Sequence, residues 1–245
     1  MKILLAPAET KNSGGEGKAF CRENFCFKEL FEKRDEIFKT YEKLLKDSSI
    51  EELSKWFGLK KLDEVEKYKK SLISKPTMKA INRYNGVAFD ALDYNTLEAS
   101  QQKYIDENVV LFSNLFGPVL ASDFIPDYKY KQGAKLPNIN VEKFYMDNFT
   151  STLDEFVGDE VIDLRAGFYE KFYKVKKAEV LTFKFIKDGK VVSHWAKFYR
   201  GKVLQEIAKN GILNHSEFMD IQIPGLQLNE IQEKKNIKTL IMDIV

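Results

Sequence analysis

Apolar residues recur along this chain at two spacings. Spacings of three and four residues, typical of amphipathic helices, occur in the ranges 27–46, 50–57, 61–72, 96–108, 141–157 and 202–209. Short, mostly apolar runs, typical of buried strands, occur at 2–6, 109–112, 160–164 and 238–244. The range 113–123 is expected to be a loop, and 87–92 fits either a strand or a helix.

A β-hairpin is the other strong expectation. Apolar and polar residues alternate from 178 to 187, Asp188-Gly189 supplies a two-residue turn, and a return strand is expected from Val191 to Tyr199. No internal repeat or linker divides the chain, and helices alternate with strands without a regular βαβ rhythm. The sequence therefore predicts one compact α+β domain (a mixed α/β fold) over 1–245, built on a mixed sheet.

The range 48–75 is expected to protrude from this domain as a pair of short helices. Two serines followed by two acids start the first helix, and Gly58 ends it. Gly58, Lys60 and Lys61 lie in the connection, whose amides could grip one phosphate of a nucleic acid as a helix-hairpin-helix element does. The alternative is an ordinary helical corner with a glycine cap.

Composition narrows the class of protein. Apolar residues make up 44% of the chain, which is enough for a core, but no apolar run approaches the roughly 18 residues of a membrane span. The first residues lack the pattern of a signal peptide. Cys21 and Cys26 are expected to be free thiols, and His194 and His215 show no metal-ligand spacing. We therefore expect a cytoplasmic monomer with no metal, cofactor or membrane contact.

Charge is distributed unevenly, although the net charge is only +2. Residues 80–164 hold 6 Lys and Arg against 14 Asp and Glu, whereas the ranges on either side are basic. The range 165–202 is the most basic, with 11 cations against 3 acids, and aromatic residues alternate with those cations. This pattern favours nucleic-acid binding through stacking and phosphate contacts, and packing of the same aromatics in the core is the alternative.

The loop after the first strand is a candidate anion site. Glu9, Thr10 and Lys11 follow the strand, and the glycines and the lysine of 14–18 come next. Glycines expose backbone amides, and the lysines add positive charge beside them. An ordinary surface turn explains the same residues.

A second candidate anion site is Lys197, Arg200 and Gly201. These residues are expected where the return strand of the hairpin meets the next helix. The two cations could converge on one anion, the glycine would let the backbone approach, and the helix N-terminus would add partial positive charge.

Several short motifs resemble those of one known family. They are Ile3 to Lys11; Tyr84, Gly86, Phe89 and Leu92; Ser113, Leu115, Phe116, Gly117 and Asp123; Tyr128, Lys129, Gly133, Lys135 and Leu136; Asp163, Leu164, Arg165 and Tyr169; and Lys197, Arg200 and Gly201. In these motifs the chain is similar to the YaaA family, the peroxide-stress-resistance proteins, from Met1 to about Lys209. The range 48–75 and the part after Gly211 match that family least.

The resemblance implies a positively charged cleft that binds DNA and limits oxidative damage during peroxide stress. The expected anion-binding residues are Thr10, Lys11, Tyr128, Lys129, Lys135, Arg165, Lys197, Arg200 and Gly201. RNA or a small nucleotide are alternative partners, and binding to a duplex should weaken steeply with salt.

Two other functions stay open. An enzyme acting on a nucleobase, nucleotide or damaged nucleic acid would use Glu9, Asp163 or Tyr169 for acid–base work, with Tyr84 or Phe116 as an aromatic wall. An iron-sequestering role is disfavoured by the few cysteines and histidines. The anion-site hypotheses require that the loop after the first strand, 128–136 and 197–201 meet around one cavity.

Overall fold

The computed structural model describes residues 1–15, 17 and 19–245. The strands are β1 (Lys2–Leu5), β2 (Thr77–Lys79), β3 (Val109–Ser113), β4 (Gly117–Leu120), β5 (Phe124–Pro126), β6 (Glu160–Leu164), β7 (Glu179–Lys187), β8 (Lys190–Val191), β9 (Leu226–Lys234) and β10 (Ile237–Ile244). The α-helices are α1 (Phe31–Asp47), α2 (Ile50–Phe57), α3 (Leu62–Lys69), α4 (Ala80–Arg83), α5 (Val87–Leu92), α6 (Ala99–Asn108), α7 (Val141–Val157), α8 (His194–Asn210) and α9 (His215–Asp220). Short 3₁₀ turns lie at η1 (Arg22–Asn24), η2 (Lys28–Leu30), η3 (Tyr94–Thr96) and η4 (Gly167–Lys171).

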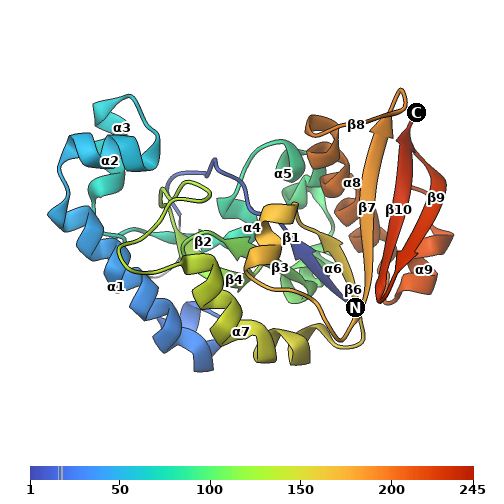
Figure 1. The fold of residues 1–245 in the computed structure, drawn as a ribbon, viewed down its shortest axis with the longest axis horizontal. Helices are drawn as coiled ribbons and strands as arrows, with labels where there is room; N and C mark the ends of the chain where they lie inside the picture. Colours follow the sequence, from blue (N-terminus) through green and yellow to red (C-terminus); the bar gives the residue numbers. More distant parts are fainter. Residues whose placement is uncertain (16, 18) are drawn as a thin grey trace.

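An eight-stranded mixed sheet forms the centre of the molecule (Figure 1). Its order is β4-β3-β1-β6-β7-β10-β9, with β8 paired to β7, and β2 and β5 form a separate two-stranded sheet. Strands β3, β1, β6, β7 and β10 run parallel, while β4, β8 and β9 pair antiparallel. The expected α+β domain with a mixed sheet is confirmed.

Strand β1 lies in the buried interior of this sheet. Ile3, Leu4 and Leu5 are each at most 3% exposed. Because helices cover both faces of a parallel sheet, consecutive residues of such a strand are apolar, as Ile3, Leu4 and Leu5 are here. Burying each Leu or Ile stabilises the fold by roughly 1.5–3 kcal/mol. The short apolar run at the start of the chain is therefore a central strand.

The order in which the chain adds strands to the sheet changes direction at β1. From β1 the chain reaches β3 on one side and later β6 on the other, and both pair with β1 in parallel. In open α/β sheets, loops diverge at the carboxyl end of such a strand and leave a crevice for ligands. The loop after β1 therefore occupies the position where the topology favours a site.

Helices α2 and α3 lie together at one end of the molecule, next to the end of α1 (Figure 1). The Ser49 hydroxyl accepts a 3.2 Å hydrogen bond from the Glu52 amide, and Gly58 ends α2 with a φ of 68°. The expected helix over 50–57 is confirmed. An ion pair between Lys67 and Asp127 (3.0 Å) holds α3 against the segment that follows β5.

Several expectations about local structure were wrong. The range 191–199 is not a return strand, because β8 has only two residues and α8 begins at His194. The expected turn at Asp188-Gly189 is present, with positive φ at both residues. The range 113–123 contains strand β4, and strand β9 lies in a range where no element was expected.

Within the part of the chain that the structure describes, no helix has both the length and the apolar character needed to cross a membrane.

Candidate ligand pocket at the end of strand β1

A pocket of about 330 Å³ opens at the carboxyl ends of β1 and β6. We call it the β1 pocket, and it is lined by residues 5–10, 85–89, Gln132, Leu164, Ala166, Tyr169, Lys197 and Arg200. The loop after β1, the 128–136 segment and the 197–201 segment each contribute to its wall. The expectation that these three distant segments share one cavity is confirmed.

Arg200 is the most distinctive residue in the wall. Its side chain is half-buried, yet it makes no hydrogen bond or ion pair with any described residue. Burial lowers the pKa of Arg200, and the charge of Asp163 opposes that shift. An unpaired guanidinium facing a cavity offers a rigid fork of donors to a phosphate or carboxylate.

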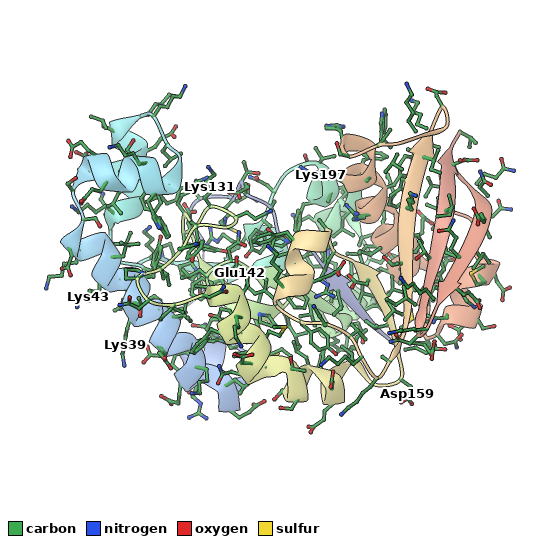
Figure 2. The ribbon with its side chains drawn as sticks, in the orientation of Figure 1. Lys39, Lys43, Lys131, Glu142, Asp159 and Lys197 are labelled. Carbon is green, nitrogen blue, oxygen red and sulfur yellow. The ribbon has the colours of Figure 1, made fainter. Side chains whose placement is uncertain are left out.

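Lys197 lies one helical turn before Arg200 and lines the same pocket. Residues three apart share a helix face, so the two cations point to one side of α8. Lys197 is exposed and, among the described residues, has no ion-pair partner. Figure 2 shows Lys197 near the start of α8, on the same edge of the molecule as Lys131.

Gly201 has a different role from the one expected. It lies inside α8, seven residues after the helix begins, so no helix N-terminus follows it. A Cβ at this position would be 2.9 Å from the carbonyl carbon of Ala88 and 3.0 Å from the Cβ of Ala91. Gly201 is therefore needed for the close packing of α8 on α5. The helix N-terminus expected after it was wrong, and a ligand contact through its backbone stays a prediction.

Glu9 and Thr10 line the β1 pocket as expected. The Glu9 carboxylate accepts a 2.8 Å hydrogen bond from the Gln132 amide and lies 3.7 Å from the Lys129 ammonium. The Thr10 hydroxyl donates to the Asn85 carbonyl (2.9 Å). These contacts connect the loop after β1 to the 128–136 segment and to the range 85–89. Lys129 therefore supports the pocket through its contact with Glu9.

Lys11 does not line the pocket. Its ammonium lies 4.3 Å from the ring centre of Tyr128 and 5.3 Å from that of Tyr84, two buried residues. It donates to the carbonyls of Ala8 (3.5 Å) and Glu9 (3.3 Å). Burial lowers the pKa of Lys11 to about 7, and the nearby Glu9 carboxylate opposes that shift.

Tyr128 is a core residue. Its hydroxyl lies 2.8 Å from the hydroxyl of Tyr84 and 2.7 Å from that of Ser113. Phe116 is also fully buried, so neither Tyr84 nor Phe116 forms the aromatic wall that was expected. Phe89 and Tyr169 line the pocket instead, and burial raises the pKa of Tyr169.

Arg165 and Asp163 form an internal ion pair. Arg165 donates to both oxygens of Asp163 at 2.9 and 2.6 Å, and to the carbonyl of Tyr173 at 2.8 Å. The Arg165 side chain is only 2% exposed and stacks over the ring of Phe112. Neither residue lines the β1 pocket, so the phosphate contact expected of Arg165 and the acid–base role expected of Asp163 do not fit this geometry.

A second cavity, of about 610 Å³, lies beside the β1 pocket. We call it the lysine groove, and its lining includes Lys135, Lys143, Lys171, Lys174 and Phe168. Gln132 and Tyr169 face the β1 pocket while Gly133 and Phe168 face the groove, so adjacent residues separate the two cavities. Lys135 therefore lines the lysine groove and is separated from Lys197 and Arg200, which line the β1 pocket.

The hairpin residues are near this region but outside both cavities. A Cβ at Gly58 would lie 3.5–3.9 Å from the Lys131 side chain, and the Trp56 indole donates to the Lys135 carbonyl (3.0 Å). Lys61 lies 3.8 Å from Glu64, and both Lys60 and Lys61 are exposed. The helix pair is present, and its use as a phosphate-gripping element stays a prediction.

The glycines after Lys11 pack against the protein. The Gly17 amide donates to the Thr77 carbonyl (2.9 Å), and a Cβ at Gly15 would be 2.9 Å from the Thr77 carbonyl carbon. The buried Arg83 side chain donates hydrogen bonds to the carbonyls of Asn12 and Gly14 and so holds residues 12–14 in place. Gly15 and Gly17 therefore serve close packing, whereas Gly14 has a φ of 76° and no atom within 4 Å of the place where a Cβ would lie. Lys18, also expected beside an anion, lies outside the described residues.

Sequence reasoning did not assign the start of α5 and Gln132 to the site. Residues 85–89 line the pocket at the first turn of α5, and Gly86 precedes that helix with a φ of 111°. The signal in the sequence that could have indicated this part of the site was Gly86, which stands directly before the apolar range 87–92. Within the described chain, no three or more His, Cys, Asp or Glu side chains gather as metal ligands do.

The fold and site define an α/β protein with a pocket at the switch point of its sheet, and Lys197 and Arg200 belong to the wall of that pocket. The model of the family described as "Peroxide stress protein YaaA" matches residues 1–232, and the chain belongs to this family. That description supports a role in oxidative stress.

Curated relatives of similar length match along nearly the whole chain. An uncharacterised protein of Campylobacter jejuni is 44% identical over 246 residues, with 100% of each chain covered. A UPF0246 protein of Corynebacterium glutamicum is 34% identical over 253 residues, covering 99% of this chain and 100% of its own. A UPF0246 protein of Malacoplasma penetrans is 27% identical over 247 residues, covering 96% and 97%.

Proposed function

We propose that this protein binds nucleic acid in the response to peroxide stress and takes the phosphate of one nucleotide unit into the β1 pocket. The observation that carries the proposal is Arg200, a half-buried cation that faces the pocket without a partner among the described residues. Leaving a charge partly desolvated and unpaired is costly to a fold, so such a residue is typical of a site completed by a ligand.

The size of the pocket favours a single nucleotide unit. Its volume of about 330 Å³ is at the lower end of the roughly 300–1,000 Å³ range of small-molecule sites. The walls combine apolar and aromatic surface from Pro7, Phe89 and Tyr169 with the charges of Lys197 and Arg200. A base could pack on the former while its phosphate meets the latter.

The flanking strand would run along the basic edge of the molecule. Lys131 and Lys197 lie on this edge from two different elements (Figure 2). Gly58, at the end of α2, lies beside the Lys131 side chain, and the exposed Lys60 and Lys61 follow it in the chain. Such lysines neutralise phosphates whatever the base sequence of the nucleic acid, and this neutralisation releases counterions from the nucleic acid.

A second candidate function is an enzyme acting on a nucleobase, nucleotide or damaged nucleic acid. The observation that favours it is Glu9, whose carboxylate belongs to the pocket wall. Tyr169 would serve as a hydrogen-bond donor, because a tyrosine phenol is protonated at neutral pH and burial raises its pKa further. Product formation from modified nucleosides or oligonucleotides, lost in Glu9→Gln, would establish this function.

Fluorescence anisotropy with a labelled 5′-phosphorylated oligonucleotide tests the binding proposal. Arg200→Gln should weaken binding about tenfold or more, because a charge-assisted hydrogen bond is worth roughly 1.5–3 kcal/mol. Lys202→Gln is the matched control, since Lys202 is on the same helix but does not line the pocket and bonds to Gln205. Affinity should fall steeply as salt rises; salt-independent binding, or equal binding by Arg200→Gln, would reject the proposal.

A further inference from the structure

The loop after β1 turns two of its carbonyl groups inward. The Lys11 ammonium donates hydrogen bonds to the carbonyls of Ala8 and Glu9, at 3.5 and 3.3 Å, and to no other described residue. It lies over the buried rings of Tyr84 and Tyr128 and is not part of the pocket wall. Lys11 therefore holds these two carbonyls on the side of the loop that faces the core.

The following amides must then point the other way. In a trans peptide the N–H is directed opposite to the preceding carbonyl, and the described residues contain no cis peptide bond. The amides of Glu9 and Thr10 are thus directed away from Lys11. No described residue accepts a hydrogen bond from either amide, and both residues belong to the pocket wall.

Arg200 lies in the same pocket, on a different element. We propose that the amides of Glu9 and Thr10, oriented by Lys11, form with Arg200 a subsite for a phosphoryl group, and that Lys11 is its positioning residue. The assignment of the ligand as a phosphate rests on the proposed function. The orientation of the amides rests on the Lys11 contacts alone.

The chemistry of this subsite suits a phosphate monoester. Successive backbone amides that converge on one point bind tetrahedral oxyanions, and an arginine fork supplies two further parallel donors. The Glu9 carboxylate, which would repel an anion, is engaged by the Gln132 amide and lies near Lys129. Lys197 adds a second cation to the wall.

The Lys11 ammonium also places a positive charge beneath the loop while it is protonated. The charged groups that act on it are Glu9 and Asp127, which favour its charged form, and Lys129 and Arg83, which oppose it. The phenols of Tyr84 and Tyr128 face it from the core. Binding of a phosphate dianion on the other face of the loop should favour the charged form of Lys11.

Isothermal titration with adenosine monophosphate, inorganic phosphate and adenosine tests the subsite. Lys11→Met should weaken binding of adenosine monophosphate about tenfold and leave the weak binding of adenosine unchanged. Lys75→Met is the matched control, because it removes another partly buried lysine that donates to a backbone carbonyl, that of Asp127 (3.2 Å), and Lys75 does not line the β1 pocket. Its affinity should stay within about threefold of the unmodified protein.

A pH profile separates positioning from a structural role. Between pH 7 and 9 a phosphate monoester stays a dianion, since its second pKa is about 6. The affinity of the unmodified protein and of Lys75→Met should fall several-fold over this range, whereas that of Lys11→Met should stay flat. Equal profiles in Lys11→Met and the unmodified protein would overturn the positioning role.

Amide resonances give a readout that needs no variant. Saturating inorganic phosphate should shift the Glu9 and Thr10 amide protons of the unmodified protein downfield, more than those of the Gly14 and Gly15 amides. Phosphate binding without those shifts would reject the amide subsite but leave the proposed function standing if Arg200→Gln still weakens it. Absence of any binding of phosphate or nucleotide would reject both.

Discussion

Replacement of Gly201 by alanine should both destabilise the fold and damage the β1 pocket. The added Cβ would lie 2.9 Å from the carbonyl carbon of Ala88 and even closer to its oxygen. An ordinary contact begins at 3.4 Å, so α5 and α8 must separate by at least about 0.5 Å. The clash is with backbone on one side and helix on the other, so no flexible side chain can absorb it.

The magnitude follows from two opposing terms. Overpacking of this kind costs roughly 1–3 kcal/mol, and more when backbone must move. Alanine gains about 1 kcal/mol over glycine in a helix interior. Because the clash is with backbone, the cost lies at the upper end of this range, and we expect a net loss of about 2 kcal/mol in the free energy of unfolding. Nucleotide binding should also weaken, because α5 and α8 both line the pocket.

Urea denaturation followed by circular dichroism measures the first effect, and anisotropy titration of the folded variant measures the second. Gly167→Ala is the control, since its nearest neighbour would be the Glu170 carboxylate at 3.7 Å and its stability should change by less than about 0.5 kcal/mol. If Gly201→Ala is as stable as the unmodified protein and binds equally well, the reasoning about the α5–α8 contact is refuted.

Three further outcomes follow from the charged residues. Burial lowers the folded-state pKa of Lys11 to about 7 and that of Lys75 to about 8, so the unfolded chain binds more protons than the folded protein above these values. The free energy of unfolding should therefore rise from about pH 7 to 10, and Lys11→Met should reduce the slope of this rise. A flat profile by denaturant titration would contradict this. Arg165→Ala should cost roughly 3–5 kcal/mol in thermal unfolding by leaving Asp163 unpaired; a loss under 1 kcal/mol would contradict the internal ion pair. Arg200→Gln should leave the melting temperature unchanged or slightly raised, because it removes a partly desolvated charge, while weakening nucleotide binding; a large loss of stability would assign Arg200 a structural role.

The elements with strong periodicity were predictable from the sequence. The helix over 141–157 and the strand over 160–164 have the bounds that the apolar spacing indicates. The expected helix pair over 50–72 is also present, although α3 ends at Lys69. In each case local spacing and burial agree, which is the condition under which pattern decides structure.

The range after the hairpin turn shows how this reasoning fails. Its aromatic and basic residues alternate loosely from Val191, which favours a strand. The buried positions Ala196, Tyr199, Val203 and Ile207 instead recur at three and four residues, and they place one face of α8 on the sheet. The longer helical period therefore outweighs the short alternation. Strand β9 was not predicted because it is an exposed edge whose polar side chains leave no apolar pattern.

The candidate site was predictable in outline but not in roles. Chemical type identified Glu9, Lys197 and Arg200 as pocket residues, and all three line the β1 pocket. Arg165 and Lys11 have the same charge as the pocket cations. Arg165 is nevertheless paired with the internal carboxylate of Asp163, and Lys11 lies beneath the loop after β1. Which cations are free is decided by long-range packing that a single sequence does not display.

A crystal structure of the protein with adenosine monophosphate tests the central claim most directly. We predict the phosphate in the β1 pocket, within hydrogen-bond distance of the Arg200 guanidinium and of the Glu9 and Thr10 amides. Density for the nucleotide in the lysine groove, or an empty β1 pocket at saturating nucleotide, would contradict the account.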